Sequence, residues 1–251
     1  MKLFILLALL GAFPAWSQVT DSTSQTPFPA KSNFRSGFLM EPGYAYVATL
    51  IPTMRSFFRD NHVKTESNLD KIIVAGFGYR LYRFKGMIHS FVGLDQRLLP
   101  PPEPAGSNLV ARRQNLSGLD VHLGYDVANT RNKRVFINAG VGSIRYEYSL
   151  FRTTSQIVPF QTIFQYAPPA SVPSLYLTSG YWDVHVEVSQ REKRKDTFLW
   201  VSRIGYRRGF QPIAWQSEAY QLTDAPRDRI SQFYLQLGIY FSRNRLDRRN
   251  Q

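Results

Sequence analysis

Residues 182–188 read Trp-Asp-Val-His-Val-Glu-Val, and this stretch decides the fold. Every second residue is apolar, and the residues between them are Asp183, His185 and Glu187. A β-strand directs alternate side chains to opposite faces, so one face of this strand carries two carboxylates and an imidazole. The class of protein depends on what that charged face meets: bulk water, a metal ion or the interior of a closed sheet.

The first residues indicate the compartment. Lys2 precedes an apolar run over residues 3–13, and a small-residue cleavage site, Ala-Trp-Ser, ends at residue 17. This order predicts a secretory signal peptide over residues 1–17, because the run is shorter than the ~20 residues of a spanning helix. The chain contains no Cys, so the sequence provides no disulfide, no thiolate metal site and no lipid-modified cysteine. We expect an exported protein that meets a membrane through strands.

The distribution of charge argues against nucleic acid as a partner. The formal net charge is +13, with 31 Lys and Arg against 18 Asp and Glu. Many of the basic residues fall in separate short clusters, at 80–85, 131–134, 191–195 and 243–249. A nucleic-acid interface more often gathers its basic residues on one helix or one surface, interleaved with aromatic residues. We therefore expect no nucleic-acid partner.

Period-two alternation recurs along the chain and predicts eight strands. The clearest is the last, over residues 233–241. The apolar set changes phase around Gly140 and Gly142, which predicts a β-bulge there. The connections alternate strictly in length, with long ones at about 51–70, 96–112, 150–179 and 211–228 and short ones at 82–85, 128–133 and 191–195.

This alternation in length predicts a membrane barrel. In an up-and-down antiparallel barrel, successive connections lie at opposite ends, so the long loops come together. Transmembrane β-barrels have this asymmetry, with short periplasmic turns and long extracellular loops. The sequence therefore predicts an all-β fold, an eight-stranded antiparallel up-and-down transmembrane barrel over residues 42–241. A soluble lipocalin-like barrel, which would turn its charges outward, is the structural alternative.

Aromatic residues gather where the strands would cross the two lipid interfaces. The predicted girdle at the turn rim contains Tyr79, Tyr82, Phe84, Tyr240 and Phe241. The predicted girdle at the loop rim contains Tyr146, Tyr148, Tyr181, Trp182 and Phe210.

If the apolar face of residues 182–188 meets lipid, the charged face points into the barrel. An eight-stranded barrel is narrow enough to be filled by side chains, and buried charges need partners. We predict a polar network that plugs the lumen, in which Arg145, Arg203 and Arg207 neutralise the carboxylates. The predicted members are His89, Asp95, Asp120, His122, Asp126, Arg145, Glu147, Asp183, His185, Glu187, Arg203 and Arg207.

The chain resembles the small eight-stranded outer-membrane β-barrels of the OmpA/OmpX type, or porin family, of Gram-negative bacteria. The resemblance rests on the signal peptide, the eight alternating strands, the alternation of long and short connections, and a last strand that ends in Tyr240-Phe241. The resemblance implies a place in the cell outer membrane, contact with its lipid, and recognition by the barrel-assembly machinery. It implies periplasmic termini, with an N-terminal segment at 18–41 and a basic tail at 242–251. The tail departs from members that stop at the terminal aromatic residue.

We expect no catalytic residues, metal ion or cofactor. Three histidines fall on inward faces near acids, but no HxH or HExxH spacing marks a metal site. Ser90 and Ser202 face outward whereas His89 faces inward, so a serine and its base would lie on opposite faces. We expect a non-enzymatic barrel with a structural or interaction role in the envelope. A narrow passive channel and a lipid-modifying enzyme are the alternatives.

The first long loop predicts a short amphipathic helix, because Met54, Phe57 and Phe58 have helical spacing within residues 51–63. Such a helix packs on its own barrel or contacts a partner, and the first arrangement is favoured because a short helix rarely stands alone in water. Exposed loops on a rigid scaffold are the usual place for binding. We expect any protein or envelope partner at the extracellular loops, and the sequence does not identify it.

Overall fold

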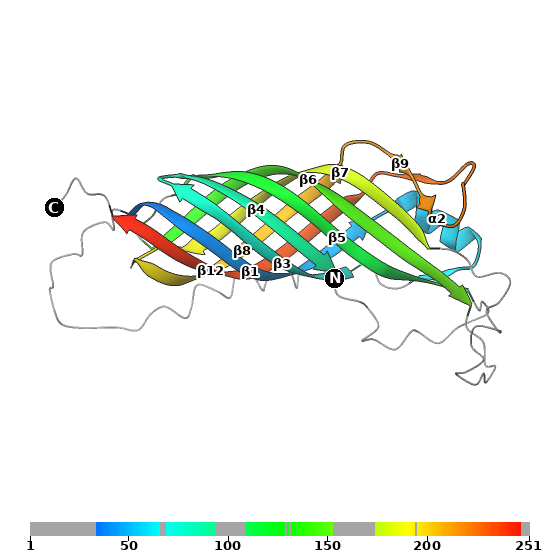
Figure 1. Cartoon of the computed structure of the whole chain (residues 1–251), viewed down its shortest axis with the longest axis horizontal. Coiled ribbons are helices and arrows are strands. Elements are labelled where there is room, and N and C mark those ends of the chain that lie inside the picture. Colours follow the sequence, from blue (N-terminus) through cyan, green and yellow to red (C-terminus); the bar gives the residue numbers. More distant parts are fainter. Residues whose placement is uncertain are drawn as a thin grey trace, which may run out of the picture. The chain divides into compact units, whose positions relative to one another are not determined.

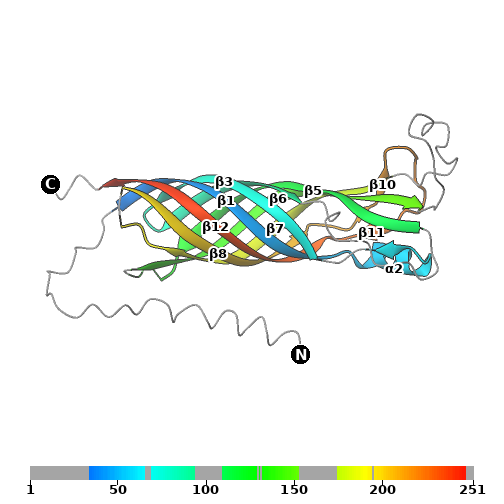
Figure 2. The ribbon, with the colours of Figure 1, turned by 90° about the horizontal axis from the view of Figure 1, so that it is seen from below.

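The fold, taken from a computed structural model, is a closed antiparallel barrel of eight long strands (Figure 1, Figure 2). The structure describes residues 34–65, 69–93, 109–128, 130, 132–152, 174–193 and 195–246. The barrel strands are β1 (Phe34–Leu50), β3 (Leu69–Leu81), β4 (Phe84–Gly93), β5 (Leu109–Asp126), β6 (Lys133–Arg152), β7 (Leu175–Gln190), β8 (Asp196–Gly209) and β12 (Ser231–Leu246). Each pairs with its neighbour along the chain, and β1 pairs with β12 to close the barrel.

The smaller elements lie in two of the long connections. Helix α2 (Pro52–Asp60) and β2 (Lys64–Thr65) follow β1, and β2 runs parallel to the start of β5. The connection after β8 contains β9 (Ile213–Ala214), β10 (Gln216–Ser217) and β11 (Arg227–Asp228). Among the described residues, no helix has the length and apolar character needed to cross a membrane.

Long and short connections alternate around the barrel, as the sequence predicts. The short ones are residues 82–83, 127–132 and 191–195, and the long ones are residues 51–68, 94–108, 153–174 and 210–230. Phe34 pairs with Leu246 at the end of the barrel where the short turns lie (Figure 1). The prediction of an eight-stranded up-and-down barrel is confirmed.

Strand pairing reaches beyond the predicted range of 42–241. β1 begins at Phe34, and β12 continues to Leu246. β1 stays in register with β3 from Ser36 to Ala48, and the intervening Pro and Gly conceal the alternation of this strand in the sequence. Parts of the segments assigned to the N-terminal region and to the tail are therefore strand.

The outer wall carries an apolar belt. From Leu119 to Val127, which directly follows the end of β5, every second residue is apolar or aromatic, faces outward, and is at least 40% exposed. At ~3.3 Å per residue and a tilt of about 40°, this run is roughly 20 Å tall, close to the lipid-facing band of outer-membrane barrels. Nearer the loops, the same face of the strand becomes polar at Ser117. An exposed apolar surface of this extent is typical of a face that contacts a membrane or another protein, and its height favours a membrane.

The belt continues around the barrel. Its members on other strands include Ile73, Phe77, Ile88, Ile137, Val184, Trp200 and Phe233. The inward charged residues, by contrast, are buried, and Asp120, Asp183 and Glu187 are at most 1% exposed. A lipocalin-like barrel has the opposite arrangement, so the structure excludes that alternative.

The phase change predicted to be a bulge at Gly140 and Gly142 has another cause. β6 keeps its register with β7 without interruption, and the register shift with β5 lies between Arg113 and Asn115. Alternation runs through both glycines, and the inward positions become apolar from Ile144 onward. The sequence therefore records a change in the lining of the lumen, from charged near the short turns to apolar near the loops.

Several aromatic residues assigned to the lipid girdles point inward. Tyr146, Tyr148, Tyr181 and Tyr240 are at most 7% exposed, whereas Phe210 faces outward and is 54% exposed. The hydroxyl groups of Tyr146, Tyr181 and Tyr240 donate to carboxylates in the lumen, which explains why these residues do not take the lipid-facing side. Tyr148 packs with Phe58 and Trp215 instead.

Replacing Leu123 with Arg tests the membrane belt. Leu123 is 73% exposed at the middle of the outward run of β5. In a membrane, an Arg at this depth should lower the free energy of unfolding by ~2–4 kcal/mol, whereas at a water-exposed site the change should stay within ~0.5 kcal/mol. Urea unfolding of the refolded protein in lipid vesicles measures the difference.

The matched control is Ser117→Arg, on the same face of the same strand but beyond the belt. We expect a change of at most ~1 kcal/mol there, as for residues near a membrane interface. Equal effects of the two substitutions would contradict the assignment of the belt.

Candidate functional site

The candidate site is the charged interior of the barrel, because strand alternation directs most of the predicted network there. The structure buries, on the inward face, His89, Asp120, His122, Asp126, Asp183, His185, Glu187, Arg203 and Arg207. Asp95 lies outside the described residues.

Arg145 and Glu147 are placed elsewhere. Both lie on β6 beyond the apolar belt, on its outward face, and the side chain of Arg145 is 39% exposed. The Arg145 guanidinium lies 2.8 Å from the Glu218 carboxylate in the loop after β8 and 3.7 Å from Glu147. Arg145 therefore belongs to the loop-side rim and does not neutralise carboxylates in the lumen.

Arg203 on β8 is the hub of one part of the lumen. Its Nη1 and Nη2 donate to the two carboxylate oxygens of Glu41 at 2.7 and 2.5 Å, and its Nε donates to Glu187 Oε2 at 2.7 Å. Lys85 donates to the same oxygen of Glu187. Tyr240 and Gln236 also bond to these groups. The two-point contact of Arg203 with Glu41 is the strong, directional form of an ion pair.

A second group joins aspartates and histidines. Arg207 donates through Nε to Asp183 Oδ2 at 3.0 Å, and its Nη2 lies 3.6 Å from Asp120 Oδ2. Asp120 Oδ1 lies 2.5 Å from His122 Nε2 and 3.1 Å from His89 Nδ1. Asp183 Oδ1 lies 2.7 Å from His185 Nδ1. Two carboxylates and one guanidinium thus hold three imidazole rings in the lumen.

A third group lies near the short turns. Glu192, from the last of these turns, lies 3.0 Å from Arg80 and 2.8 Å from Arg134. Arg134 also donates to Asp126 Oδ2 at 2.8 Å. All four side chains are buried. This group joins residues of three barrel strands to a turn and fills the short-turn end of the lumen.

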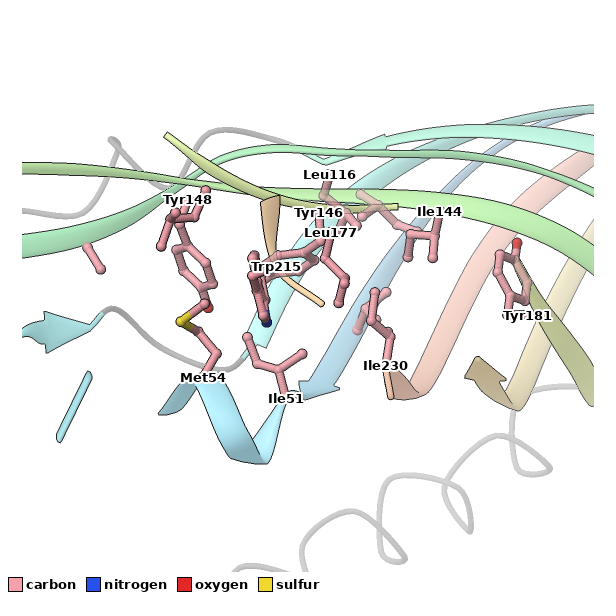
Figure 3. Packing of buried hydrophobic residues seen from close by; sticks show 14 of the residues in the cluster. Ile51, Met54, Leu116, Ile144, Tyr146, Tyr148, Leu177, Tyr181, Trp215 and Ile230 are labelled. Atoms are coloured by element: carbon pink, nitrogen blue, oxygen red, sulfur yellow. The ribbon is translucent and has the colours of Figure 1, made fainter. Parts of the chain in front are cut away.

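The loop end of the lumen is lined mainly by apolar residues and is filled by the first and last long loops (Figure 3). It also buries one ion pair, in which Arg113 lies 2.9 Å from Asp70. Met54 and Phe58 of α2 are buried, whereas Phe57, the third predicted contact residue, is 43% exposed. The ring centroids of Phe58 and Tyr148 lie 5.3 Å apart, and those of Tyr148 and Trp215 lie 5.7 Å apart. The helix predicted in the first loop therefore exists and packs against its own barrel.

Asp228 ties these two loops together. Its carboxylate accepts hydrogen bonds from the backbone amides of Thr53 and Met54, both at 2.8 Å, and from Trp215 Nε1 at 2.9 Å. Helix α2 has no side-chain cap of its own at Ile51. The helix N-terminus is thus capped by a residue of the last loop.

Within the described chain, an apolar wall surrounds an interior filled by charged and aromatic side chains. The chain has the fold of a small outer-membrane β-barrel. No family model and no curated protein matches its sequence. Similar solved structures include Neisserial surface protein A, which is 12% identical with a TM-score of 0.46 and covers 81% of this chain and 96% of that one.

Two further outer-membrane barrels have comparable likeness. Ail, the attachment invasion locus protein of Yersinia pestis, is 9% identical with a TM-score of 0.42, covering 83% of this chain and 100% of that one. A major outer membrane protein of Thermus thermophilus is 8% identical with a TM-score of 0.44, covering 82% and 98%. Likeness at this level concerns the fold, and function must be argued from the residues.

Several members of the barrel's interior network were missed in the sequence. Glu41 falls in the segment assigned to the region before the barrel, although it shares the inward parity of Leu39 on β1. Lys85, Arg80 and Arg134 read as charges of the short turns. These three residues could have been found from strand alternation, because each occupies an inward position. The alternation of faces continues closer to the turn than the run of apolar residues does.

Arg203→Met tests whether the network supports the barrel. The change leaves Glu41 without its cationic partner in a buried position, so it should lower the free energy of unfolding by ~3–5 kcal/mol. Adding Glu41→Gln should recover part of that loss, because Glu187 keeps Lys85. The double variant should fall short of the sum of the single effects by ~1–3 kcal/mol, measured by urea unfolding.

Arg243→Met provides the control. Arg243 lies 4.0 Å from Asp196 at the exposed turn rim, and exposed pairs contribute at most ~1 kcal/mol. If Arg203→Met lowers the free energy of unfolding by no more than Arg243→Met does, the network does not stabilise the barrel.

Proposed function

We propose that this chain is a closed, non-conducting and non-enzymatic outer-membrane barrel that serves the envelope as a rigid structural and binding scaffold. The observation that carries the proposal is the filled lumen. Three charged groups, and then an apolar plug that encloses the ion pair of Asp70 and Arg113, follow one another from the short turns to the loops. A lumen filled in this way would contain no continuous aqueous path, so the protein would act through its surfaces.

The central group supports a closed lumen most directly. Arg203 on β8 reaches Glu41 on β1 and Glu187 on the neighbouring β7. Lys85 on β4, the strand opposite β8, donates to the same oxygen of Glu187, so this group spans the lumen. Both carboxylates are at most 1% exposed. A pore would require water around these charges, and solvated ion pairs lose much of their mutual attraction.

The loop end supports a binding role. Helix α2, Trp215 and Asp228 hold parts of two long loops against the barrel, so these loops are presented in a fixed arrangement. Binding functions commonly reside on loops that a rigid scaffold positions. In this proposal a protein or envelope partner binds at the long loops, and nucleic acid does not.

The proposed topology follows from the same geometry. The long loops face outward from the cell, and the short turns and both termini lie in the periplasm. Residues 1–17 direct export and are cleaved, and the barrel-assembly machinery inserts the chain. The basic residues beyond Phe241 remain on the periplasmic side.

Planar-bilayer recording tests the closed lumen. In 1 M KCl we expect no discrete conductance steps from the refolded protein, because its lumen lacks a water path. Arg203→Ala combined with Glu187→Ala should produce small steps, since it removes the side chains that span the centre. Steps from the unaltered protein would favour the narrow-channel alternative.

Single-cysteine labelling tests the topology, because the natural chain has no Cys. Thr223 in the last long loop and Lys193 in a short turn are both exposed. Thr223→Cys should react with a membrane-impermeant maleimide on intact cells, whereas Lys193→Cys should react only after the outer membrane is opened. The reverse result would invert the topology and remove the loops from the cell surface.

A further inference from the structure

Three strands bring His122 and Asp183 to one place in the lumen. His122 on β5 pairs in register with Gly140 on β6, and Gly140 pairs with Asp183 on β7. These three residues form a row across the sheet, with a glycine in the middle. His185 lies two residues beyond Asp183 on the same inward face.

The hydrogen bonds of His122 define the state of its ring. Its Nε2 lies 2.5 Å from Asp120 Oδ1, and the other oxygen of Asp120 accepts a bond from the Tyr181 hydroxyl at 2.8 Å. A carboxylate can only accept, so Nε2 carries the proton and, in a neutral ring, Nδ1 has a free lone pair. A metal-binding histidine characteristically donates its other N–H to a carboxylate in this way.

The free nitrogen faces further ligand atoms. His122 Nδ1 has no hydrogen-bond partner although the residue is only 2% exposed, and it lies 3.6 Å from Asp183 Oδ1. His185 Nδ1 lies 2.7 Å from that oxygen and donates to it in the metal-free chain. It becomes a ligand atom when the ion displaces this proton and the neutral ring carries its proton on Nε2 instead. One ligand atom from each of the three residues lies within 4.8 Å of the others. An unprotonated nitrogen and a carboxylate oxygen do not bond to each other, but both bind a cation.

Gly140 keeps this space open. A Cβ at this position would lie 2.5 Å from His122 Nδ1. Any other residue would therefore press on the nitrogen that faces Asp183, and glycine lets the imidazole cross β6 to reach β7.

The charge of the central lumen also calls for a cation. The charged side chains in this part of the described structure are four carboxylates and three cations, Glu41, Asp120, Asp183 and Glu187 against Lys85, Arg203 and Arg207. If the histidines are counted as neutral, one negative charge is in excess, although His89 lies between two of these carboxylates, 3.1 Å from Asp120 and 3.4 Å from Glu41. Buried unbalanced charge is costly, and a bound cation would remove it.

We infer that His122 Nδ1, Asp183 Oδ1 and His185 Nδ1 bind one divalent first-row transition-metal ion in the barrel lumen. Two imidazoles and one carboxylate suit zinc and its neighbours in the series better than calcium or magnesium, which prefer oxygen ligands. The ion would link β5 to β7 across β6. This departs from the expectation of no metal, which rested on spacing within single strands.

The test is to refold the full chain from urea into detergent with Zn²⁺ alone, remove loose metal by gel filtration over a chelating resin, and measure zinc by mass spectrometry. We expect about one zinc per folded chain, with nitrogen and oxygen neighbours at ~2.0–2.2 Å in X-ray absorption. A folded chain that retains no zinc would overturn the inference, and a protonated His122 bridging Asp120 and Asp183 would then balance the charge.

Variants locate the ion. His185→Gln and Asp183→Asn should weaken zinc retention at least ~10-fold, the loss seen even when only a ligand's hydrogen-bond partner is removed. The matched control is His89→Gln, which removes a buried histidine that contacts Asp120 but not Asp183, and His62→Gln is the exposed control. Both should retain zinc.

Loss of zinc in His89→Gln, with retention in His185→Gln, would place the ion on the other side of His122 and overturn the assignment. Heat-modifiable migration on gels reports whether each variant folds. If a variant fails to fold, the zinc content and absorption spectrum of the unaltered chain still decide the question.

Discussion

A closed eight-stranded barrel leaves little room inside for water to solvate a charge, so each inward charged side chain needs a partner on another strand. Arg203 on β8 meets this requirement by bonding to Glu187 on the neighbouring β7 and to Glu41 on β1, beyond β12. Slipping a strand by one residue would turn its charges toward lipid and its apolar residues inward. The ion pairs therefore select one register of closure, which is a better-attested role for buried charges than added stability.

The two halves of the lumen are filled by different kinds of side chain. Near the short turns, charged groups fill the interior and the outer wall is apolar. Near the loops, where the outer face of β5 and β6 becomes polar, the interior becomes apolar around Tyr148, Met54 and Trp215. Along its length, the barrel thus changes from an apolar outer face around a charged interior to a polar outer face around a mainly apolar interior. The second arrangement is that of a soluble barrel.

Alternation and the sorting of loop lengths were enough to predict the closed barrel, the inward face and the helix with Met54 and Phe58. These features depend on residues that are near one another in the chain. The partners of the charges depend on register between distant strands, so Glu41 could not be assigned to Arg203 from sequence. Arg145 was misplaced because the predicted bulge at Gly140 and Gly142 reversed the parity of β6, whereas the strand continues without a bulge and its outward face becomes polar beyond the belt. The sequence placed His122 and Asp183 in one network, but their approach across β6 depends on the register of three strands, which the sequence does not show.

The cap on α2 has a consequence for the order in which the molecule assembles. The helix lies in the first loop, yet the carboxylate that receives its first amides belongs to Asp228, 174 positions after Met54 in the chain. A helix of this length without a cap is marginal in water. The first loop should therefore not form its helix until the last strands have paired. Helix α2 would then be the last element to fold, and the loop end of the barrel the last part to close.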